Sequence, residues 1–138
     1  MRLALWLVLI GACGGGPSIP GPGDDDIPPP DGGPGPDGTG VITFNWQLSV
    51  DGTLAECFEV GAVEVELLSM NVATSEEFLR RFGCAPTGNG TSNPLPPGTY
   101  SNLISLLDSS ALAIQTQSNA QTVSDGGVSN AGLIIFNL

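Results

Sequence analysis

The sequence has no histidine and no lysine, and its three arginines stand against 14 aspartates and glutamates in 138 residues, a net charge of −11 at pH 7. A charge of this sign repels phosphate backbones, so we expect no nucleic acid among the partners. Histidine is the side chain that most often transfers protons and ligates metals near neutral pH. Its absence leaves a narrow catalytic inventory, and we expect neither an enzyme nor a bound metal or cofactor.

Long apolar runs are also missing, because the longest one, Leu3 to Ile10, ends after eight residues. It follows a single positive side chain at Arg2 and precedes two small residues and Cys13. About 20 apolar residues are needed to cross a bilayer, so this run is too short to span one. A short apolar run between a positive start and small residues is typical of a targeting signal that is recognised and cut.

The end of this run, Ile-Gly-Ala-Cys from Ile10 to Cys13, resembles the lipobox of bacterial lipoproteins. The resemblance implies that residues 1–12 are a signal peptide and that the Cys13 thiol carries a diacylglyceryl group at the start of the mature chain. Two or three acyl chains anchor a protein stably, which implies a lipid-anchored protein of the bacterial cell envelope. Gly14 after the cysteine implies the outer membrane, at its periplasmic or surface face. The alternatives are a conventional cleaved signal and an uncut hydrophobic tail.

A linker follows the lipidated cysteine and completes a segment from residue 13 to residue 40. Ten glycines, eight prolines and five aspartates occupy the 27 positions from 14 to 40. Such a composition buries too little apolar surface to offset the entropy lost on folding. We therefore expect a disordered Gly/Pro/Asp linker that separates the anchor from a domain at residues 41–138.

From Val41 onward the pattern changes to a period of two. Apolar side chains occupy every second position of residues 42–50 and polar ones lie between them, as in a strand with one buried face. Asp51-Gly52 is then typical of a hairpin turn. The pattern predicts an all-β domain, a single antiparallel β-sandwich of about six to seven strands. Further strands are expected at residues 62–69, 76–84, 100–107, 111–117 and 133–138, with a short piece at 121–123.

The sequence assigns a buried face to one of these segments and leaves it ambiguous in another. In the 62–69 segment, Val63, Val65 and Leu67 are expected to face the core because they alternate with two glutamates. In the 76–84 segment, the burial of either face is ambiguous. Residues 75–82 also fit a two-turn helix as an alternative to a strand. After that segment, residues 85–94 are rich in Gly, Asn and Pro and are expected to form a loop.

Once Cys13 is lipidated, Cys57 and Cys84 remain as an even pair, 27 residues apart. An exported protein meets an oxidising compartment, so we expect these two to form a disulfide. Closing a loop of this length contributes about 3 to 4 kcal/mol in the chain-entropy model. Two cysteines without histidine make a poor zinc site, and no metal is expected there.

The stretch Leu-Pro-Pro-Gly-Thr-Tyr from Leu95 to Tyr100 resembles a turn of transthyretin-like and carboxypeptidase-regulatory-like sandwiches, in which leucine-proline-x-glycine-x-tyrosine leads into a core strand. Pro97 and Gly98 suit the centre of a type II turn, after which Tyr100 points its ring inward. In that family the module is generally a noncatalytic accessory or adhesive scaffold, so the resemblance implies no active site.

Charged side chains supply the few candidates for chemistry. Glu64 and Glu66 would lie about 7 Å apart on one strand face, within range for the paired carboxylates of a glycoside hydrolase. Alternation with apolar residues makes a solvated sheet face the stronger interpretation. Glu76 and Glu77 are expected to form surface ion pairs with the adjacent arginines at 80 and 81.

Three functions are therefore compared. The favoured one is an envelope lipoprotein whose noncatalytic sandwich makes structural or protein contacts, with the membrane as a partner through its anchor. The second is a module that binds a carbohydrate or another extracellular ligand through loops such as residues 85–94. The third and least favoured is a carboxylate-based hydrolase using Glu64 and Glu66.

Overall fold

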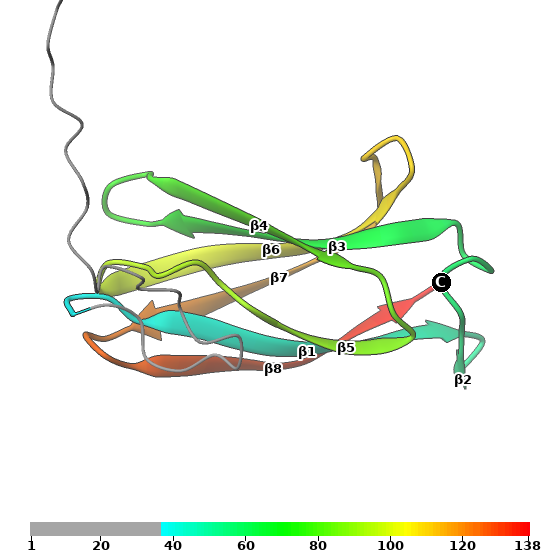
Figure 1. Ribbon diagram of the computed structural model, residues 1–138, viewed down its shortest axis with the longest axis horizontal. Coiled ribbons are helices and arrows are strands. Elements are labelled where there is room, and N and C mark those ends of the chain that lie inside the picture. Colours follow the sequence, from blue (N-terminus) through cyan, green and yellow to red (C-terminus); the bar gives the residue numbers. More distant parts are fainter. Residues whose placement is uncertain (1–36) are drawn as a thin grey trace, which may run out of the picture.

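The computed structural model describes residues 37–138, and all of its regular structure is β-strand. Two sheets pack face to face, as Figure 1 shows. The expected all-β sandwich is confirmed, with eight strands instead of six or seven. They are β1 (Val41–Val50), β2 (Thr53–Leu54), β3 (Ala62–Asn71), β4 (Glu77–Gly83), β5 (Thr87–Thr91), β6 (Gly98–Asp108), β7 (Ala113–Val123) and β8 (Val128–Asn137). The predictions for residues 1–36, including the signal peptide, Cys13 and most of the linker, lie outside the described residues.

The first sheet is built around β1, which pairs with β2 and β5 on one edge and with β8 on the other. The second sheet has the order β4-β3-β6-β7. Neighbouring strands are antiparallel as expected, except that β1 and β8 run parallel. Asp51 and Gly52 both have positive φ angles, 50° and 78°, so the predicted hairpin turn joins β1 to β2.

Strand boundaries differ from the sequence prediction in several places. The segment expected as a loop contains β5, and β8 starts five residues before the expected position 133. The expected strand at 76–84 is confirmed as β4, so its helical alternative is wrong. The two pieces expected at 111–117 and 121–123 form the single strand β7. It begins at Ala113 because Ala111 has a φ of 60°, a turn conformation that cannot continue a strand.

The core lies between the sheets, where β1 presents its apolar face. Phe44, Trp46 and Leu48 are at most 3% exposed, as the alternation predicted. On β3, Val65 and Leu67 are buried, but Val63 is 45% exposed, which corrects the expectation that it faces inward. The β3–β6 register shifts between Ala62 and Glu64, so Val63 is the extra residue of a β-bulge and turns outward.

The turn before β6 also differs from its prediction in one respect. Tyr100 is fully buried, as expected, and its hydroxyl donates a 2.7 Å hydrogen bond to the Pro96 carbonyl. Gly98, however, has a φ of 159°, far from the value of about 80° that the expected type II turn requires. Glycine suits this position because other residues rarely adopt such a φ, and a Cβ would also lie 2.9 Å from the amide nitrogen of Asn71.

Cys57 and Cys84 are joined in a disulfide, as the cysteine count predicted. The bond links the turn before β3 to the residue after β4. Because β5 begins three residues later in the other sheet, the disulfide lies where the chain crosses between sheets. Trp46 reinforces this crossing, since its indole N–H donates a 3.0 Å hydrogen bond to the Ala85 carbonyl.

Candidate functional site

The outer surface of the β5-β1-β8 sheet carries a set of uncharged side chains, which we call the polar face. Because Phe44 and Trp46 point into the core, their neighbours on β1 point outward. The strand registers align Thr43 with Thr91 and Asn130, Asn45 with Asn89 and Leu133, and Gln47 with Thr87 and Ile135. These nine residues form the polar face, and none of them is ionisable.

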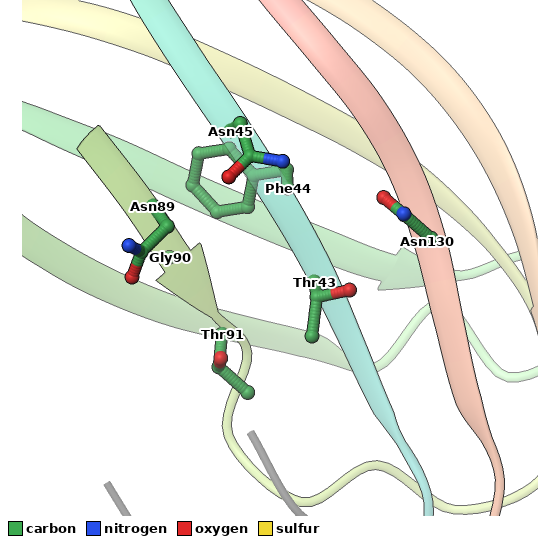
Figure 2. Close-up of a pocket in the computed structure, with 7 residues that line it drawn as sticks. All are labelled: Thr43, Phe44, Asn45, Asn89, Gly90, Thr91 and Asn130. Atoms are coloured by element: carbon green, nitrogen blue, oxygen red, sulfur yellow. The ribbon is translucent and has the colours of Figure 1, made fainter. Parts of the chain in front are cut away.

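Two shallow depressions lie on the polar face. The first has a volume of about 350 Å³ and is lined by Thr43, Phe44, Asn45, Asn89, Gly90, Thr91 and Asn130. Figure 2 shows these side chains arriving from three neighbouring strands, β5, β1 and β8. The second, about 320 Å³, is lined by Asn45, Trp46, Gln47, Thr87, Gly88, Asn89 and Leu133. Because both share Asn45 and Asn89, these two amides stand at the centre of the face.

Two glycines of β5 bring aromatic rings close beneath this face. Gly90 lies opposite Phe44, and Gly88 lies opposite Trp46. A Cβ on Gly90 would lie 2.6 Å from the Phe44 ring, and one on Gly88 would collide with the Trp46 ring. The Phe44 ring also packs edge-on against Phe82 of β4, with centroids 5.6 Å apart. The depressions therefore rest on a floor of packed aromatic rings.

The central amides are free to bind something else. Within residues 37–138, the side chains of Asn45, Gln47 and Asn89 make no hydrogen bond. Asn130 is already engaged, since its Oδ1 accepts a 2.8 Å hydrogen bond from the Gly132 N–H. Each free amide offers two donors and an acceptor. The face therefore suits an uncharged polar ligand, and it contains no side chain suited to proton transfer.

The two carboxylates proposed for hydrolysis lie on the other sheet, away from this face. Glu64 and Glu66 project from β3, and both pair with Arg81 of β4, at 3.7 Å and 2.8 Å respectively. The expected ion pairs with Glu76 and Glu77 are therefore wrong, since within residues 37–138 Arg81 pairs with other glutamates and Arg80 with none. The β3–β4 register, which places Arg81 opposite Glu66, decides its partner.

The second arginine has a structural role. The Arg80 guanidinium lies 5.6 Å from the centre of the Phe82 ring, and its Nη1 donates a 3.0 Å hydrogen bond to the Ser92 carbonyl. Arg80 thereby ties β4 to the segment after β5, across the edges of the two sheets. Residues 85–94, which the second hypothesis assigns to a ligand-binding loop, contain the strand β5, whose outward residues belong to the polar face. Sequence alternation could not indicate this, because β5 has glycine at its inward positions 88 and 90.

Within residues 37–138, no group of three or more histidine, cysteine, aspartate or glutamate side chains lies close enough together to hold a metal ion. No helix among those residues has the length and apolar character to cross a membrane. The predicted lipidation residue, Cys13, lies outside the described range.

Comparison with known proteins identifies no family. No family model matches the sequence, and no curated protein matches it. Among solved structures, the chain is similar to a leucine-rich repeat protein from Bacteroides thetaiotaomicron VPI-5482, with a TM-score of 0.43 and 19% sequence identity. The likeness covers 74% of this chain and 14% of that one, so this chain spans about a seventh of the length of its structural neighbour.

Proposed function

We propose that this protein is a lipoprotein of the bacterial cell envelope, anchored through Cys13 and carrying a noncatalytic β-sandwich that makes structural or protein contacts. The observation that carries the anchor is the lipobox-like sequence that ends at Cys13 after a short apolar run. The Cys57–Cys84 disulfide supports export, since such bonds persist mainly in oxidising compartments. An outer-membrane position follows from Gly14 by the same resemblance.

Metabolic labelling with palmitate tests the anchor in cells that produce the full chain. The wild-type protein should incorporate label and partition with membranes, and a Cys13→Ser variant should do neither. A Cys57→Ser, Cys84→Ser variant is the matched control, because it removes two other cysteines and leaves the proposed acylation site intact. An unlabelled, freely soluble wild-type protein would reject the lipoprotein assignment.

The polar face favours a second function, binding of a neutral carbohydrate. Its free amides at Asn45, Gln47 and Asn89 supply paired donors and acceptors for sugar hydroxyls, and Leu133 offers an apolar surface beside them. The lack of charge on this face, in a protein with a net charge of −11, argues against a charged ligand there. The paired-carboxylate hypothesis receives no such support, because Glu64 and Glu66 both form ion pairs with Arg81.

Affinity electrophoresis of the full chain through gels containing dextran, laminarin or mannan tests this second function. At least one neutral polysaccharide should retard the wild-type protein, and an Asn45→Ala, Asn89→Ala variant should migrate freely. A Ser118→Ala variant, altered on an exposed part of the opposite sheet, should be retarded like the wild type. Equal migration of all three proteins in every gel would reject carbohydrate binding at this face.

A further inference from the structure

Phe58 is the most exposed large apolar side chain in the described residues, at 80%. It lies in the turn between β2 and β3. Glu59 follows it directly and Glu56 precedes it by two positions, and both of these acidic residues are exposed. A single exposed apolar residue is common on protein surfaces. Phe58 differs from such residues because its turn is held by hydrogen bonds and because a depression lies beside it.

The turn that carries Phe58 is tightly held. The Glu59 N–H donates to the Glu56 carbonyl at 3.1 Å, and the Glu59 carboxylate accepts from the Glu56 N–H at 2.8 Å. The Ala62 N–H donates to the Cys57 carbonyl at 2.9 Å, and Cys57 is fixed by its disulfide. A ring presented on so constrained a backbone loses little conformational entropy when it docks, which is the property of a good binding anchor.

A partly apolar depression lies beside this turn. It has a volume of about 310 Å³ and is lined by Val50, Thr53, Leu54, Ala55 and Glu59. Leu54, at its rim, is 53% exposed. We call Leu54, Glu56, Phe58 and Glu59 the far-pole patch: a projecting ring and an exposed leucine next to a depression, with two carboxylates beside them.

The far-pole patch lies at the opposite end of the domain from the first residue of β1. The ten residues of β1 extend from Val41 to Val50, a length of about 33 Å, and the patch follows directly after them. Figure 1 shows β2 at the opposite end of the sandwich from the start of β1. The first strand thus begins at one end of the domain, and the far-pole patch lies at the other.

We propose that the far-pole patch docks a segment of a partner protein in which apolar side chains lie beside lysine or arginine. This proposal rests on the proposed function, since it names the contact surface of the envelope sandwich. Phe58, Leu54 and the depression beside them contact the apolar side chains of the segment, and Glu56 and Glu59 attract its positive charges. A second copy of this chain is a poor occupant, because it would bring the same carboxylates face to face.

Selection from a phage-displayed library of random linear peptides, with purified full-length protein as bait, tests the chemistry. The enriched peptides should combine aromatic or aliphatic residues with lysine or arginine. Phe58→Ser should weaken their binding by at least about tenfold, as loss of a hot-spot residue does. Glu56→Lys, which keeps the backbone bond of this turn, should weaken it too, and added NaCl should act in the same direction.

Val72→Ser is the matched control, because Val72 is 59% exposed and follows β3 at the opposite end of the sandwich. This variant should bind the peptides like the wild type. Failure to enrich peptides, enrichment of acidic peptides, or equal binding to the Phe58→Ser variant would overturn the proposal. So would a homodimer in sedimentation that Phe58→Ser dissociates, which would identify a second copy as the occupant. Palmitate labelling is independent of all these outcomes, so a failure of the anchor is recognised separately.

Discussion

The hydroxyl of Tyr100 reaches back four residues and donates a 2.7 Å hydrogen bond to the Pro96 carbonyl. This geometry is that of the tyrosine corner found in many β-sandwiches, in which a buried ring closes the turn before its own strand. The same ring packs against Phe78 of β4, with centroids 6.2 Å apart. One side chain therefore ties the turn before β6 to the core and to the edge of the sheet.

Removing only this hydroxyl should destabilise the domain. Tyr100→Phe keeps the buried ring but leaves the Pro96 carbonyl without its partner, which should cost about 1 to 2 kcal/mol of unfolding free energy. Equilibrium unfolding in urea measures the loss. A midpoint unchanged from the wild type would show that water replaces the hydroxyl at no cost.

The disulfide should account for a large part of the stability. A Cys57→Ser, Cys84→Ser variant should lose about 3 to 4 kcal/mol, because the unfolded chain regains the freedom of a 27-residue loop. Reduction of the wild type should lower its free energy of unfolding by a similar amount and leave that of the double variant unchanged. If reduction destabilises both proteins equally, the effect does not come from this bond.

Glycine at position 90 should be required by the ring beneath it. Gly90→Ala places a Cβ 2.6 Å from Phe44 and 2.9 Å from Phe82, so the packed rings must move, at a cost of about 1 to 3 kcal/mol. Gly83→Ala is the control, since a Cβ there meets nothing within 4 Å. Thermal unfolding should show a lower midpoint for the first variant and little change for the second. Equal midpoints would mean that the two rings move aside without a measurable cost in stability.

The ion pairs of Arg81 should contribute little. Its side chain is 44% exposed, and those of Glu64 and Glu66 are 39% and 18% exposed, so solvent reaches the guanidinium in both pairs and screens the attraction. Arg81→Met should cost less than about 1 kcal/mol, and high salt should shrink the difference further. Urea unfolding at low and high NaCl measures both quantities. A loss of several kcal/mol, insensitive to salt, would show that Arg81 stabilises the sheet by packing.

Much of the fold was predictable from local patterns. The alternation from Ile42 to Val50 identifies β1 because a strand with one buried face repeats every two residues. Asp51-Gly52 identifies the hairpin because both residues accept positive φ angles. The disulfide followed from counting cysteines.

The differences come from contacts between distant segments. β5 lacks the apolar alternation of a strand because the rings of β1 occupy the space that its inward side chains would fill. Val63 follows the alternating pattern but faces solvent, since the pairing of β3 with β6 introduces a bulge. The partner of Arg81 is chosen by the β3–β4 register, not by the nearest glutamate in the chain.

The candidate site, like the fold, was predictable from the sequence only in part. The outward hydroxyls and amides of β1 are visible in the sequence, but their alignment with Asn89 and Thr91 appears only once β5 pairs with β1. The turn that presents Phe58 follows from sequence only in part, because its disulfide partner lies 27 residues away.

Sequence alone determined that the chain after residue 40 is an all-β domain, because strand periodicity and turn chemistry depend on adjacent residues. Tertiary structure alone decided which polar side chains share a face and which aromatic residue is left exposed at the end of the sandwich. The physical reason is that register, bulges and sheet packing depend on residues far apart in the chain, whose contacts no local pattern specifies.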